Sequence, residues 1–150
     1  MKKRSHRMQS VAGIAKNREQ NAARVLGQKR KHLEEQNAKL DELLSYREEY
    51  AKNTHISGDN GLTARQLNEY RLFLEKLNMA IMQQRERVQQ ASDDCDLFQV
   101  SWLKTRTHSK ALDKVVEKNK KGEKLEQDKK EQHELDERVM QLNAGKNDDR

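Results

Sequence analysis

The chain has 150 residues, of which 33% are hydrophobic, 4% aromatic and 37% charged, with a formal net charge of +6 and no proline. This apolar content is too low for a rounded globule with a buried interior, although the length suffices for one domain. Long helices and disordered segments share such a composition, and the modest net charge with regular apolar spacing favours helices.

The first residues are basic, but only the short stretch 10–15 follows before Lys16 and Arg18, so an apolar signal-peptide core is missing. No run approaches the roughly 18 apolar residues of a membrane span. Cys95 is the single cysteine, which excludes an intrachain disulfide and suits a reducing compartment. We therefore expect a cytoplasmic chain in which Cys95 is a small core residue.

The first predicted helix covers about residues 5–53. Its apolar stripe recurs at steps of three and four, which keeps side chains on one face of a helix. A Gly-, Asn- and Asp-rich segment at 54–62 predicts a turn. The stripe comprises Val11, Ala15, Arg18, Ala22, Leu26, Leu33, Gln36, Leu40, Leu43 and Tyr50.

The second predicted helix covers about residues 63–142 and is followed by a frayed tail at 143–150. Thr63 and Gln66 form a capping box at its start, and Leu62 and Leu67 can close a hydrophobic staple across the box. A denser stripe then extends over five heptads. It comprises Leu67, Tyr70, Leu74, Leu77, Ile81, Gln84, Val88, Ala91, Cys95, Phe98 and Trp102.

Folding the chain back at the turn pairs the two stripes in opposite directions, for example Leu43 with Leu74 and Gln36 with Ile81. The predicted fold is all-α, a long antiparallel two-helix coiled-coil hairpin, with residues 1–150 as a single domain. The second helix is longer, so its C-terminal part overhangs. A lone helix of this kind is marginal in water unless a partner covers it.

Charge divides the predicted rod. Residues 1–31 hold ten Lys and Arg against one acid, residues 32–61 hold three against seven acids, and residues 102–124 hold eight against three. Pairing brings both basic segments to the open end, where phosphates or an acidic protein could bind. Near the turn, Tyr46 and Phe73 belong to an apolar surplus that one seam cannot bury, which favours a docking patch over self-association.

Nothing in the residues indicates catalysis. The segment 58–61 lacks the lysine of a phosphate loop and the ligands of a calcium loop, and the five histidines are scattered. A two-helix rod also lacks a concave pocket for shifting carboxylate pKa values. We expect no enzyme activity, no metal and no cofactor.

An ordered set of residues resembles the flagellar type III export protein FliJ family, from about residue 9 to 142. The matching residues are Leu43, Tyr46, Tyr50, Gly61, Thr63, Leu67, Tyr70, Phe73, Leu74, Leu77, Ala80, Ile81, Trp102-Leu103, Ala111-Leu112, Glu131-Gln132 and Asp136-Glu137. After Trp102 the pattern departs from the family's arginine cluster, because Thr105 and Thr107 interrupt Lys104 and Arg106.

This resemblance implies a non-enzymatic stalk protein at the cytoplasmic face of the inner membrane. Its partners would be the hexameric flagellar export ATPase, the cytoplasmic domain of the membrane export gate, and export chaperones. The implied gate patch is Lys39, Leu43, Tyr46, Tyr50, Phe73, Leu77, Ala80 and Gln84, and the implied ATPase-ring contacts are Val11, Ile14, Leu125, Leu135, Val139 and Leu142. A virulence type III stalk and a basic coiled coil on nucleic acid are the alternatives.

Overall fold

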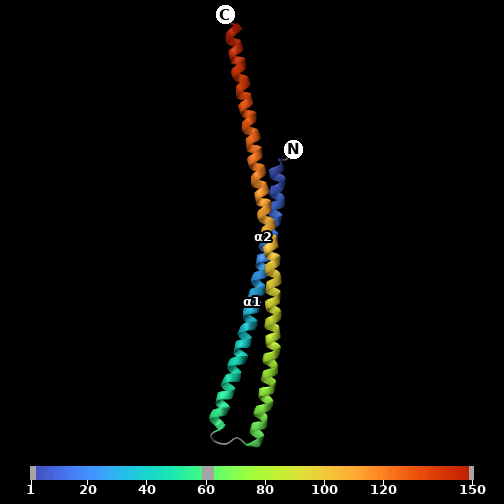
Figure 1. Cartoon of the computed structure of the whole chain (residues 1–150), viewed down its shortest axis with the longest axis vertical. Coiled ribbons are helices and arrows are strands. Elements are labelled where there is room, and N and C mark those ends of the chain that lie inside the picture. Colours follow the sequence, from blue (N-terminus) through green and yellow to red (C-terminus); the bar gives the residue numbers. More distant parts are fainter. Residues whose placement is uncertain (1–2, 59–62, 149–150) are drawn as a thin grey trace. The chain divides into compact units, whose positions relative to one another are not determined.

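The computed structural model describes residues 3–58 and 63–148, which form the two helices α1 (Arg4–Gly58) and α2 (Ala64–Asp148) without a strand in either range. The residues group into two compact units. Unit 1 contains residues 3–19 and 105–148, and unit 2 contains the described residues of 20–104. Within each unit the segments of α1 and α2 run antiparallel (Figure 1). The predicted all-α helical hairpin is confirmed.

Both helices are longer than the sequence predicts. α1 ends at Gly58 rather than near residue 53, so residues 54–58 of the expected turn are helical, while residues 59–62 lie outside the described residues. α2 ends at Asp148 rather than near residue 142, which includes most of the expected frayed tail. Glycine costs a helix only about 1 kcal/mol, and no proline is present to force an end.

The capping box at the start of α2 is confirmed. The backbone N–H of Gln66 donates to the Thr63 hydroxyl at 3.2 Å, and the Thr63 N–H donates to Oε1 of Gln66 at 3.1 Å. Two of the orphan donors at the helix start are thereby satisfied. Leu62, the expected partner of Leu67 in the staple, lies outside the described residues.

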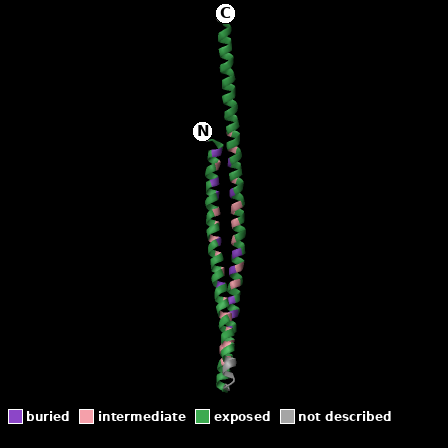
Figure 2. Cartoon of the chain, turned by 90° about the vertical axis from the view of Figure 1, so that its left-hand side faces the viewer, coloured by how far each residue is buried: buried purple, intermediate pink, exposed green. Residues whose placement is uncertain are grey.

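Unit 2 contains the predicted seam. Its core is formed by residues of the two stripes, whereas Leu67 at the start of the second stripe is exposed. Buried and half-buried positions follow the facing sides of the helices (Figure 2). Cys95 is buried among them, as predicted. The fully or nearly covered apolar residues are Leu26, Leu77, Ile81, Ala91 and Cys95.

The register of the seam differs from the prediction. The side-chain amide of Gln84 donates to both the backbone carbonyl and Oε1 of Gln36, each at 2.9 Å. Gln36 was expected opposite Ile81, so the observed partner lies three residues further along α2. In this register the buried Gln84 amide donates to acceptors of Gln36, whereas an unpaired buried amide would cost free energy.

In unit 1 the seam of α1 is built from small residues. Ala12 and Ala15 are buried together with Ser109 and Val116 of α2, while Val11 is exposed. The predicted stripe included Val11, which is wrong, since Val11 is 45% exposed and the neighbouring Ala12 is buried. Alanine and serine allow close approach of the two backbones, so packing here depends on small size rather than on large apolar area.

Candidate functional site

Four aromatic rings gather in unit 2 and form what we call the aromatic patch: Tyr46, Tyr50, Tyr70 and Phe73. Tyr50 stacks on Tyr70 with ring centroids 5.2 Å apart, and its ring lies 4.5 Å from that of Phe73. Tyr46 meets Phe73 edge-on at 6.0 Å. One turn of α1 and one turn of α2 supply these rings, because side chains three or four residues apart share a helix face.

The aromatic patch contains one largely exposed ring and three half-buried rings. Tyr46 is 51% exposed as a residue, while Tyr50, Tyr70 and Phe73 are half-buried. Large aromatic side chains with part of their surface open are the usual anchors of protein interfaces. Sequence reasoning brought Tyr46, Tyr50 and Phe73 together but assigned Tyr70 to the seam alone.

The other predicted gate-patch residues divide into two groups. Lys39 is exposed, and Leu43 and Ala80 are half-buried, so these three keep surface that a partner could contact. Leu77 is only 6% exposed and Gln84 only 4%, so both lie in the seam beneath.

The six predicted ring-contact residues lie in unit 1 and are all exposed: Val11, Ile14, Leu125, Leu135, Val139 and Leu142. Every described residue of α2 after Glu123 is exposed, and the segment 124–148 is green throughout in Figure 2. The chain thus carries an uncovered helical segment with an apolar stripe, as the predicted overhang required.

Pairing ends at Glu123 because this residue lies against the first turn of α1, which begins at Arg4. Beyond Glu123, the three-four steps of the seam from Val116 through Asn119 lead to polar positions. The apolar residues of the overhang follow a different line of the helix. These continued seam positions are Glu126, Lys130, His133 and Glu137.

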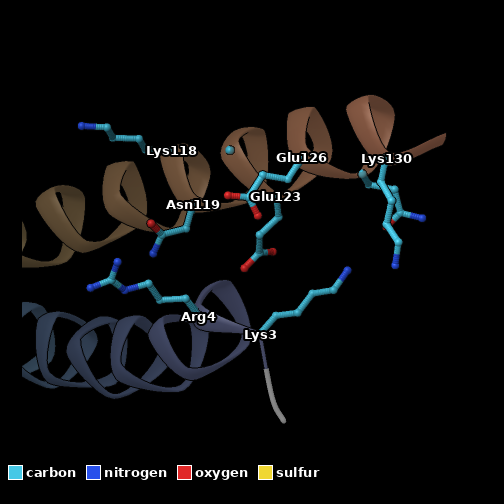
Figure 3. A pocket seen from close by; sticks show the side chains of 9 residues that line it. Lys3, Arg4, Lys118, Asn119, Glu123, Glu126 and Lys130 are labelled. Carbon is cyan, nitrogen blue, oxygen red and sulfur yellow. The ribbon is translucent and has the colours of Figure 1, made fainter. Parts of the chain in front are cut away.

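The last residue of the pairing closes the N-terminus of α1. The backbone N–H and the hydroxyl of Ser5 donate to the two carboxylate oxygens of Glu123, at 3.1 Å and 2.6 Å. Figure 3 shows the Glu123 side chain pointing at this end of α1, between Lys3 and Arg4. A carboxylate here satisfies an orphan N–H and complements the positive end of the helix dipole. Sequence reasoning missed this contact, since the two residues are 118 positions apart.

These bonds lower the pKa of the Glu123 carboxyl below its ordinary value. The Ser5 hydroxyl has the largest effect, followed by the Ser5 N–H, with smaller help from the charge of Lys3 and against a modest effect of burial. The stabilisation by ionised Glu123 is therefore complete above the ordinary glutamate pKa of about 4.3 and is lost as the pH falls through the lower folded-state pKa.

We expect Ser5→Ala to raise the pKa of Glu123 part of the way toward its ordinary value, because the hydroxyl donor is lost and the backbone donor remains. The measurement is an NMR titration of the Glu123 carboxyl carbon in the full chain. Ser10→Ala, at an exposed position of the same helix, is the control and should leave the titration unchanged. An unchanged Glu123 pKa in Ser5→Ala would contradict the assignment.

Two further classes of site were searched for among residues 3–58 and 63–148. In these ranges no three His, Cys, Asp or Glu side chains gather closely enough to hold a metal ion. Neither helix contains, within them, an apolar stretch long enough to cross a bilayer.

Comparison with known proteins places the chain in a family. The "Flagellar FliJ protein" of Escherichia coli K12 is 25% identical over 128 residues, covering 85% of this chain and 87% of that protein. The protein of the same name from Salmonella typhi is 25% identical over 130 residues, covering 87% and 88%. No solved structure matches significantly. Because the sequence profile of the flagellar FliJ protein family also matches residues 4–148, the chain belongs to this family of the flagellar export apparatus.

Proposed function

We propose that this protein is the stalk and coupling component of the flagellar export apparatus. Its uncovered C-terminal segment would enter the ring of the hexameric export ATPase, and its aromatic patch would dock on the cytoplasmic domain of the export gate. Export chaperones would be further partners. The observation that carries the proposal is the combination of family membership with an exposed overhang, residues 124–148, outside any pairing with α1.

The ring end is supported by the distribution of apolar surface in unit 1. Val11 and Ile14 on α1 and Leu125 and Val139 on α2 are apolar but exposed. A ring lumen would bury these side chains and complete the overhang. One helical segment without sixfold symmetry inside a sixfold ring makes six identical subunits inequivalent, so it can promote assembly and hydrolysis without a catalytic residue of its own.

The gate end is supported by the aromatic patch. Tyr46 and Phe73 meet edge-on and Tyr46 is 51% exposed, and Lys39, Leu43 and Ala80 of the predicted gate patch also keep accessible surface. Hot spots of protein interfaces are enriched in such aromatic anchors. Docking there would place the protein at the flagellar base, peripheral to the inner membrane.

The gate contact is tested by binding of the purified gate domain to wild-type chain and to Phe73→Ala. We expect the variant to bind about tenfold more weakly or worse, equivalent to about 1.4 kcal/mol, because an anchor ring is lost. Leu97→Ala, at an exposed apolar position outside the patch, is the control. Circular dichroism checks the fold, and equal binding by Phe73→Ala and wild type would reject the gate contact.

The ring contact is tested separately with a chain that ends at Glu123. This chain keeps the Ser5 contact but lacks the overhang. Stimulation of the export ATPase should be lost, while gate binding should persist. Undiminished stimulation would reject the stalk assignment. Equal stimulation of a virulence-type ATPase by the full chain would favour the related secretion system instead.

A further inference from the structure

Unit 2 carries a shallow groove of about 430 Å³ that the proposed function does not use. One lining residue comes from α1 and five come from α2. The floor is Ile81, which is 2% exposed, and the apolar rim is formed by two methionines that are 58% and 60% exposed. The lining residues are Arg47, Asn78, Met79, Ile81, Met82 and Arg85.

A hydrogen bond between α1 and α2 restrains one side of the groove. Nη1 of Arg47 donates to Oδ1 of Asn78 at 3.1 Å, which joins α1 to α2 beside the groove. This bond restrains the guanidinium and leaves its remaining N–H donors for other acceptors. A donor that is already positioned loses less side-chain entropy when a ligand binds.

The groove and the aromatic patch lie on different sides of the seam. Ile81 belongs to the seam, with Ala80 of the predicted gate patch immediately before it and Met82 of the groove immediately after it. Successive residues of a helix are separated by about 100°, so Ala80 and Met82 point to opposite flanks. A ligand in the groove therefore leaves the aromatic patch open.

The chemistry of the lining selects the occupant. Of the six lining residues two are arginines and none is acidic, so the groove complements carboxylates. Methionine is flexible and polarisable, and surfaces rich in exposed methionine accommodate apolar helix faces. We propose that this groove binds an acidic amphipathic helix of another protein, with apolar side chains on Met79 and Met82 and carboxylates on Arg47 and Arg85.

Two other occupants fit the groove less well. Nucleic acid would find arginines, but methionine offers no aromatic face for stacking a base. A second copy of this chain carries the same net charge of +6, so general electrostatic repulsion opposes it. A helix with an apolar face bordered by carboxylates would contact both the methionines and the arginines of the lining.

The test uses the full chain with its methionine methyl groups labelled with ¹³C. The probe is a synthetic helix-forming peptide of about 18 residues, long enough to be helical when bound, with leucines on one face and glutamates beside them. We expect the NMR signals of Met79 and Met82 to shift on titration, whereas those of Met8 and Met140 stay in place. The same peptide with lysine for glutamate should bind at least tenfold more weakly.

The arginine contribution is isolated by Arg85→Glu, which should weaken the acidic peptide at least tenfold. Arg87→Glu is the matched control, because Arg87 lines a different groove with His32 and Lys39. This variant should bind the peptide as tightly as the wild-type chain does. Phe73→Ala should also bind normally. Four results would each overturn the proposal. The signals of Met79 and Met82 do not shift, or the lysine peptide binds as tightly as the acidic one. Alternatively, Arg85→Glu keeps the wild-type affinity, or a single-stranded oligonucleotide binds more tightly at the same methyl groups.

Discussion

Replacing Ile81 with aspartate should abolish cooperative folding of unit 2. Ile81 is 2% exposed at the centre of the seam, and truncating such a residue to alanine alone costs about 2–5 kcal/mol. A carboxylate at this position adds the cost of burying an unpaired charge. Since small domains are stable by only about 5–15 kcal/mol, most of the stability should be lost.

The neighbouring residue supplies the control. Met82 is 60% exposed, so Met82→Asp should change the free energy of unfolding by about 0.5 kcal/mol or less. Urea denaturation followed by circular dichroism at 222 nm, the usual helical band, compares the two variants with wild type. Similar effects of the two substitutions would show that Ile81 does not carry the seam.

Gln84→Leu should destabilise unit 2 by about 1–3 kcal/mol, because the amide that satisfies buried Gln36 is removed. Adding Gln36→Leu should restore most of this loss or exceed it, since two apolar side chains of similar size pack without an unpaired polar group. The double-mutant cycle, measured by urea denaturation, should therefore give a coupling free energy well above zero.

The same cycle tests what the polar pair is for. A buried polar pair in a coiled coil specifies register at some cost in stability. In the doubly substituted chain, alternative registers should become populated, and NMR contacts between the rings of Tyr50 and Tyr70 should weaken or split. Additive single effects, or one uniform register in the double variant, would contradict a register-setting role.

Much of the fold follows from the step pattern in the sequence. Steps of three and four identified the seam residues Leu26, Leu77 and Ile81, and the Thr63 capping box marked the start of α2. Register was predicted less well, because a seven-residue repeat looks similar when one helix slides along the other. The observed register includes a specific contact, Gln36 with Gln84, which helical periodicity does not encode.

The candidate site was predictable to a similar extent. Excess apolar residues around Tyr46 and Phe73 indicated a patch, and the rings do meet. Periodicity does not reveal how wide a seam is, so Leu77 and Gln84 were placed both in the seam and on the surface, and the structure buries them. The Ser5–Glu123 contact had no signal in the sequence, because nothing local links residues so far apart.

The exposed segment 124–148 has a consequence for the free energy of binding. Residues 124–148 are all exposed, so within this described range no packed neighbour protects the backbone hydrogen bonds. Gly145 also lowers helix propensity, although a methyl group there would meet open space. Amide hydrogens of this segment should exchange far faster than those around Ile81, through local opening. Any protein that captures the segment must then supply the entropy of ordering it, which weakens the complex and speeds its release.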